Sequence, residues 1–254
     1  MSRGYIQGTQ LPDKRLVSES TGSFSGAAIG ILLVEADYVM LPGNVANAST
    51  YDFPVVYQVL KDVTFERIAA ADPAVLDILV AGGEALIADG VRAVASACGS
   101  FANYQRAAAA ALPVPTFLSP MLQVPWIQAS LQPEQKLLVI AAVGSAITAK
   151  VYEECAITDT KRLLIEQAID VPEFEAMLSP EGFNPARLES ELATYASQLV
   201  EKHPEAGAIL LQCSDLPPFA WAIQNATGLP VYDMNTLIGW VHAAAVRRPY
   251  DGII

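Results

Sequence analysis

The chain has 254 residues and a mass of 27.0 kDa, and its 52% hydrophobic and 17% charged residues exclude a disordered chain and allow one large or two small domains. A net charge of −12 without a basic stripe argues against nucleic acid as a partner. Apolar runs are too short to span a bilayer, and no apolar segment follows Arg3, so we expect a soluble, cytoplasmic protein without a membrane partner.

The first part of the chain is typical of alternating strands and helices. An apolar run at residues 27–34 predicts a buried parallel strand, and the turn-forming segment 42–50 predicts a loop of the kind that carries ligand contacts. Asp72 and Pro73 mark the start of a helix that continues to about residue 88. A strand at 91–97, a helix at 104–111 and an extended segment at 114–117 follow.

The alternation continues in the second part. We expect helices at 120–130, 145–155, 172–177, 185–203 and 235–246, and strands at 136–143 and 208–212. Together the two parts predict an α/β fold with two pseudo-symmetric lobes, each a parallel sheet flanked by helices, and an active site in the cleft between them. The expected limits are 1–119 for the first lobe, 120–233 for the second, and 234–254 for a C-terminal helix that returns to the first lobe.

Two of the three cysteines, Cys98 and Cys213, occur in similar contexts. Each ends a short apolar run that begins with glycine, precedes small polar residues and a helix-like segment, and is followed by a Pro-Val pair 15 or 17 residues later. Ligands of parallel sheets bind beyond the carboxyl ends of strands, so the duplicated context predicts two reduced thiols in one cleft. Cys155 lacks this context and is interpreted as a small buried apolar residue.

Two thiols on opposite sides of a carbon atom can act as a two-base site for proton transfer. The ordinary cysteine pKa of about 8.5 allows each sulfur to alternate between acid and base near neutrality. A helix N-terminus after each cysteine, and the N–H groups of Gly99, Ser100, Ser214 and Asp215, would favour the thiolate and bind a substrate carboxylate. The charge of Asp215 would instead raise the pKa of Cys213, unless it points away or binds a cation.

The triplets Cys-Gly-Ser at 98–100 and Cys-Ser-Asp at 213–215 resemble the two catalytic motifs of the aspartate/glutamate racemase superfamily, which typically begin Cys-Asn-Thr and Cys-Thr-His. The resemblance spans residues 30–240. It implies a cofactor-independent enzyme with two α/β lobes and one catalytic cysteine from each. Ser100 and Ser214 would supply the hydroxyl groups, whereas the asparagine and the histidine of the motifs are absent.

This resemblance predicts a racemase or epimerase that acts on a small carboxylate, with Cys98 and Cys213 as opposed acid and base. The resemblance implies that this enzyme needs no cofactor and no metal, and we expect it to form a homo-oligomer. One alternative is a lyase or decarboxylase on the same scaffold. An example is the elimination reaction that sulfonium-propionate lyases catalyse, in which one thiolate is the base. A further alternative is a non-catalytic protein that binds small anions.

Three further residues are candidates for substrate binding. Glu35 follows the first strand, where glutamate racemases carry an acid and a hydroxyl group, and is a candidate to hold a cationic group. Asn44 belongs to the 42–50 loop, where a ligand contact and a plain turn residue are equally consistent with the sequence. The same two alternatives, a ligand contact or a purely structural residue, apply to Gln123, which lies between two prolines. His203 and His242 are interpreted as a surface cap and a helix residue, which leaves little support for a metal site.

Overall fold

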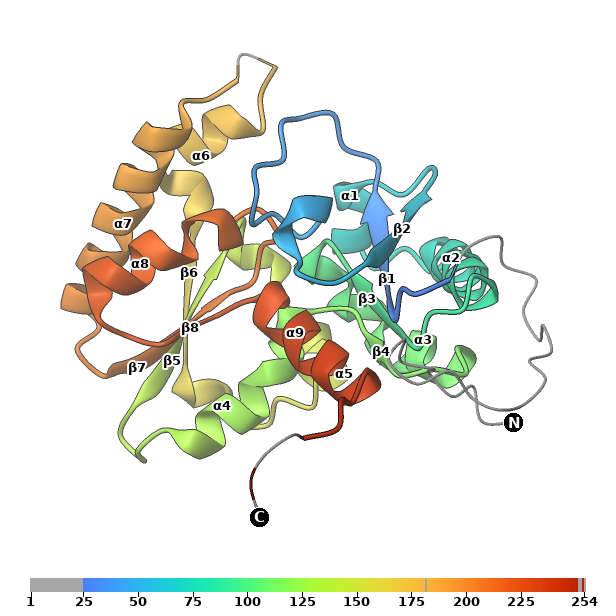
Figure 1. Cartoon of the computed structure of the whole chain (residues 1–254). Coiled ribbons are helices and arrows are strands. Elements are labelled where there is room, and N and C mark those ends of the chain that lie inside the picture. The colour runs from blue at the N-terminus through green and yellow to red at the C-terminus, as the bar shows by residue number, and fades with distance from the viewer. Residues whose placement is uncertain (1–24, 181, 251–252, 254) are drawn as a thin grey trace.

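The structure is a computed structural model, and it describes residues 25–180, 182–250 and 253. Figure 1 shows two lobes, with the first sheet and its helices on the right and the second sheet with its helices on the left. Within these residues no helix is both long and apolar enough to cross a membrane.

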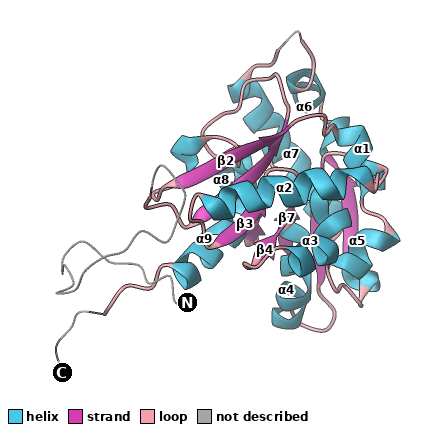
Figure 2. Cartoon of the chain, turned by 90° about the vertical axis from the view of Figure 1, so that its right-hand side faces the viewer, coloured by secondary structure: helices cyan, strands magenta, loops and turns pink. Residues whose placement is uncertain are grey.

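The first lobe contains a parallel sheet in the order β2-β1-β3-β4. Its strands are β1 at Ile29–Val34, β2 at Val55–Leu60, β3 at Ala93–Ser96 and β4 at Thr116–Phe117. Its helices are α1 at Phe65–Ala69, α2 at Ala74–Ala88 and α3 at Gln105–Ala111. Figure 2 shows α2 and α3 in front of the strands of this sheet.

The second lobe repeats this topology with the order β6-β5-β7-β8, also parallel. Its strands are β5 at Lys136–Ala141, β6 at Leu163–Gln167, β7 at Ala206–Leu211 and β8 at Val231–Tyr232. The remaining helices are α4 at Val124–Ser130, α5 at Ala149–Glu154, α6 at Pro172–Met177, α7 at Pro185–Lys202, α8 at Ala220–Thr227 and α9 at Met234–Ala245. The predicted α/β fold with two parallel-sheet lobes is confirmed.

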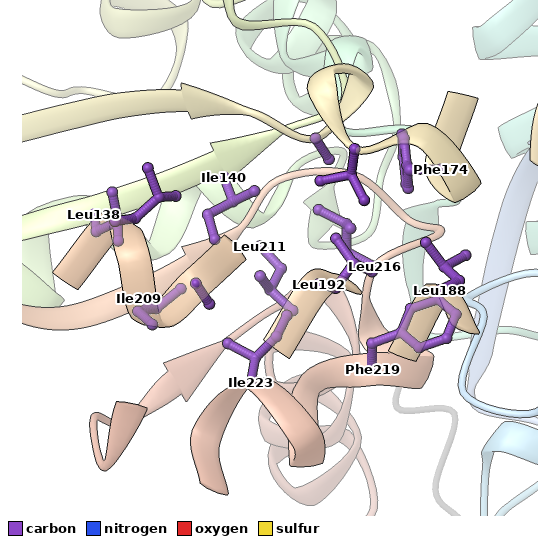
Figure 3. Close-up of a cluster of buried hydrophobic side chains, with 14 of the residues drawn as sticks. Leu138, Ile140, Phe174, Leu188, Leu192, Ile209, Leu211, Leu216, Phe219 and Ile223 are labelled. Carbon is purple, nitrogen blue, oxygen red and sulfur yellow. The ribbon is translucent and has the colours of Figure 1, made fainter. Parts of the chain in front are cut away.

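Apolar side chains fill both faces of each sheet, because both faces are covered by helices. In β5, Leu138 and Ile140 pack with α6, α7 and α8 on one face, as Figure 3 shows, while Leu137 and Val139 pack on the other face with α4 and α5. In the first lobe, Ile31 of β1 packs with α9. The last helix therefore lies on the first sheet, while the lobe limits at residues 119 and 233 stay predictions.

Three strands have no counterpart among the predicted ranges, and all three, β2, β6 and β8, are edge strands. Their side chains are mostly half-buried and include Gln58 and Glu166, so they lack the unbroken apolar run of the central strands. The short helix α1 was also not predicted. The helix expected at 145–155 begins at Ala149, because a short 3-10 helix occupies Gly144–Ala146.

Candidate active site

A cavity of about 320 Å³ lies between the two lobes, where the central strands end. Most of its wall consists of the residues that directly follow β1, β3, β5 and β7, including both Cys98 and Cys213. Phe65 of α1 and Leu178 at the end of α6 complete the wall from opposite lobes. The cavity thus has the position in which parallel α/β sheets bind ligands.

The turns that follow β3 and β7 pack directly against each other. The Ser214 hydroxyl donates a hydrogen bond to the carbonyl oxygen of Ala97, at 2.9 Å. On the other side of the cysteines, Gly99 lies so close to Gln212 that a Cβ atom at Gly99 would be 2.2 Å from the Gln212 carbonyl oxygen. These two contacts bracket Cys98 and Cys213 and hold them on one cavity, as the repeated sequence context predicts.

Close to Cys98 in the sequence, Ser100 favours the thiolate form of this cysteine, although burial opposes it. Burial raises the pKa of the Cys98 thiol to about 11, while the backbone N–H of Ser100, its hydroxyl group and the N–H of Phe101 act to lower it. The charge of Asp215 acts in the same direction as burial. The side chain is half-buried and lines the cavity, so a ligand can reach it.

The sulfur of Cys213 has the opposite kind of neighbour. Its thiol donates to Oδ2 of Asp215, at 3.5 Å. Burial and then the Asp215 carboxylate raise the pKa of Cys213 well above its ordinary value, and only the Asp215 N–H opposes them among its protein neighbours. The prediction of a helix N-terminus directly after Cys213 is wrong, because α8 begins only at Ala220. The expected preference of both cysteines for the thiolate is therefore not found.

Asp215 is a buried carboxylate at the centre of a hydrogen-bond network. Its oxygens accept hydrogen bonds from the Tyr38 hydroxyl at 2.9 and 3.0 Å and from Nδ2 of Asn44 at 2.6 Å, besides the thiol of Cys213. The side chain is 7% exposed, and burial raises its pKa above the ordinary value. No lysine, arginine or histidine among the described residues forms an ion pair with it.

Tyr38 and Asn44 reach Asp215 because the loop after β1 crosses to the second lobe. In this loop Gly43 has φ of +98° and packs on Pro218, where a Cβ atom would lie 2.7 Å from the proline Cα. The N–H of Val45 donates to the Ser214 carbonyl at 3.4 Å. Tyr38, which lines the cavity, was not identified from the sequence, since a single tyrosine in a loop carries no pattern.

The other predicted site residues are divided between the cavity and its surroundings. Gly99, Ser100, Ser214, Asp215 and Glu35 line the cavity. Asn44 contacts it only through Asp215.

Gln123 does not line the cavity, because its side-chain amide joins two helical segments. Its Nε2 donates to the carbonyl oxygen of Asp233 at 2.8 Å, and its Oε1 accepts from the Thr236 hydroxyl at 3.1 Å. The side chain is fully buried. Gln123 thus anchors the start of α9 instead of facing a ligand.

The two histidines lie in other surroundings. His203 contacts the carboxylate of Glu166 at 2.8 Å, and the ring of His242 stacks on Phe53 with 3.6 Å between centroids. In the described part of the chain, no group of three or more His, Cys, Asp or Glu side chains has the geometry to hold a metal ion.

Solved structures with a similar fold are racemases and a decarboxylase. Unliganded arylmalonate decarboxylase has a TM-score of 0.57 at 17% identity, with 88% of this chain and 94% of that chain covered. The aspartate racemase of Picrophilus torridus has a TM-score of 0.52 at 16% identity, with 89% and 96% covered. A glutamate racemase from Bacillus anthracis has a TM-score of 0.53 at 14% identity, with 86% and 82% covered.

The sequence is also similar to curated lyases, although no protein-family model matches it. Dimethylsulfoniopropionate lyase 5 of Emiliania huxleyi is 30% identical over 236 residues, which cover 89% of this chain and 47% of that protein. A dimethylsulfoniopropionate lyase of Durusdinium sp. clade D is 28% identical over 234 residues, which cover 89% and 78%. The chain thus spans about half the length of the first of these relatives.

Proposed function

The chain has the fold of the aspartate/glutamate racemase superfamily, and from this premise we propose that it is a cofactor-independent lyase that removes a leaving group from a small carboxylate, with Cys98 as the base. The observation that carries the proposal is the difference between the two thiols. The N–H and hydroxyl groups of Ser100 act to lower the pKa of Cys98, whereas the Cys213 thiol donates a hydrogen bond to the Asp215 carboxylate.

A two-base racemase needs two thiols that exchange roles at similar cost, since each must act as acid in one direction and as base in the other. The neighbours of the two sulfurs oppose this symmetry, because Ser100 favours the thiolate of Cys98 and Asp215 favours the thiol of Cys213. An elimination needs only one base. The asymmetry therefore supports the lyase alternative more than the racemase interpretation, and so do the similar dimethylsulfoniopropionate lyases.

The proposed substrate is a carboxylate with a sulfonium group on its β-carbon, the chemistry named in the relatives. The Cys98 thiolate takes the proton from the α-carbon, and the electron pair of that bond forms the double bond between Cα and Cβ. The Cβ–S bond breaks, and its electron pair leaves with sulfur as a neutral dialkyl sulfide. The product is an unsaturated carboxylate, and the proton passes from Cys98 to water.

The raised pKa of Cys98 fits a base that the substrate itself activates. A sulfonium cation in the cavity favours the nearby thiolate and partly cancels the charge of Asp215, which otherwise raises the pKa of Cys98. The N–H and hydroxyl groups of Ser100 then stabilise the thiolate. Slow alkylation of the free protein would therefore not distinguish this lyase from a non-catalytic binder, whereas product formation would.

The test is incubation of the purified protein with dimethylsulfoniopropionate, followed by gas chromatography of the sulfide and liquid chromatography of acrylate. We expect the two products in equal amounts, formed about a thousandfold more slowly after Cys98→Ala. Absence of both products, under conditions in which the protein is folded, would contradict the proposal.

A racemase or epimerase stays the second candidate, because two thiols line one cavity. Its signature is loss of optical rotation of a chiral carboxylate in heavy water, with one solvent deuterium entering the α-carbon and no fragment released. A decarboxylase would release CO2 instead.

A further inference from the structure

We infer that Asp215, held by Tyr38 and Asn44, is the subsite for the cationic group of the substrate, on the side of the cavity that faces Cys213. This inference rests on the proposed function and adds to it a direction of binding. The cationic leaving group would lie against Asp215, and the α-carbon would lie toward Cys98.

The first argument is a charge without a counter-ion. A buried carboxylate is normally paired with a cation, because removing it from water is costly. Asp215 receives hydrogen bonds from a hydroxyl, an amide and a thiol, all of them neutral, and no described cationic side chain pairs with it. These donors fix the direction of the carboxylate but leave its charge for a ligand to neutralise.

The second argument is the charge of the whole cavity. The charged residues among its described lining are Glu35, Glu66 and Asp215, all acidic. Two of these, Glu35 and Glu66, are exposed to water, so Asp215 is the carboxylate that a bound group would meet away from solvent. A ligand with two carboxylates and no cation is disfavoured here, whereas a zwitterion matches the site.

The third argument is the aromatic ring beside the carboxylate. Tyr38 lines the cavity and donates to both oxygens of Asp215. Methylated sulfonium and ammonium groups cannot donate strong hydrogen bonds, and they are recognised by charge together with an aromatic surface. Asp215 and Tyr38 supply both. A subsite of this kind selects charge and shape, so it accepts a trimethylammonium group in place of a dimethylsulfonium group.

The proposed direction of binding also predicts that loss of the Asp215 charge affects KM more than kcat. The positive charge on the leaving group disappears as the sulfide departs, so Asp215 stabilises the bound substrate more than the transition state. Asp215→Asn is therefore expected to raise KM by about tenfold or more while kcat changes less.

The decisive experiment compares two ligands of the same shape by isothermal titration calorimetry. One is 3-(trimethylammonio)propionate, and the other is 4,4-dimethylpentanoate, in which carbon replaces the charged nitrogen. The wild-type protein should bind the cationic ligand at least about tenfold more tightly, equivalent to ~1.4 kcal/mol. Asp215→Asn should remove this preference, and Tyr38→Phe should reduce it.

Asp233→Asn is the matched control, because it removes a similarly buried carboxylate that lies outside the cavity lining and keeps a good helix cap. It should leave the preference unchanged. A wild-type protein that binds both ligands equally, or a folded Asp215→Asn variant that keeps the preference, would overturn the subsite. The calorimetry does not require turnover, so it tests the subsite separately from the lyase activity. If Asp215→Asn loses the preference but the wild-type protein releases no sulfide, the result contradicts the lyase and supports the subsite.

Discussion

The turn after β3 and the turn after β7 occupy equivalent places in the two sheets, and each presents a cysteine to the same cavity. Their chemistry differs. In the first turn, the N–H and hydroxyl groups of Ser100 act to lower the pKa of Cys98. In the second turn, Cys213 is itself the donor, and Asp215 is the acceptor. A repeated fold thus fixes where two side chains meet, while the residues next to them decide which one holds its proton.

The largest expected effect separates the two cysteines directly. Cys98→Ala should lower kcat/KM for sulfide release by about a thousandfold, because it removes the proposed base. Cys213→Ala should lower it by only about tenfold, since it removes a neutral donor to Asp215. Steady-state assays of both variants, with circular dichroism to verify folding, make the comparison. An equal loss of kcat/KM in the two variants would contradict the single-base mechanism and support the symmetric two-base mechanism.

A second prediction concerns the contact that holds the two turns together. Gly99→Ala should lower the free energy of unfolding by about 2 kcal/mol, because the added Cβ would collide with the backbone of Gln212. Gly239→Ala is the control: nothing lies within 4 Å of a Cβ at that helical position, so it should be neutral or stabilising. Urea denaturation of both variants measures the difference. Equal stability of the two would mean that the turns are not closely packed.

A third prediction uses pH to test the donors around Cys98. The thiolate fraction of Cys98 rises with pH toward its pKa of about 11, so kcat/KM should rise through the neutral and alkaline range. Ser100→Ala removes a hydroxyl that lowers this pKa, and the rising limb should move to higher pH. Ser214→Ala, whose hydroxyl donates to the Ala97 carbonyl, should leave the position of the limb unchanged. A shift in the opposite direction would contradict the role of Ser100.

The smallest expected effect is on stability. Asp215→Asn should raise the free energy of unfolding at pH 7 by about 1 kcal/mol, because it removes a buried charge while keeping the shape. The pKa of Asp215 is higher in the folded than in the unfolded protein. The wild-type protein therefore becomes less stable as pH rises through the folded-state pKa and Asp215 loses its proton. The gain should therefore shrink toward pH 3, where Asp215 is protonated in both states. Thermal unfolding at both pH values measures it, and an equal gain at pH 3 would exclude the charge as its cause.

The central strands and the position of the thiols could be predicted from the sequence. Strands β1, β5 and β7 are continuous apolar runs, because sheet neighbours and helices cover them on all sides. Edge strands β2 and β6 were missed, since their half-buried faces carry polar residues. The matching contexts of Cys98 and Cys213 predicted that both sulfurs would reach one cavity, and they do.

What the sequence by itself determined is the repeated α/β pattern and the two cysteines at strand ends, because burial and turn formation leave local signals in the chain. Only the tertiary structure decided the rest. Tyr38 and Asn44 lie far along the chain from Asp215 and meet it through a loop that crosses between lobes, whereas Gln123 is directed toward α9. Such contacts leave no local pattern, since hydrogen bonds and buried charge depend on distances in space and not on spacing along the chain.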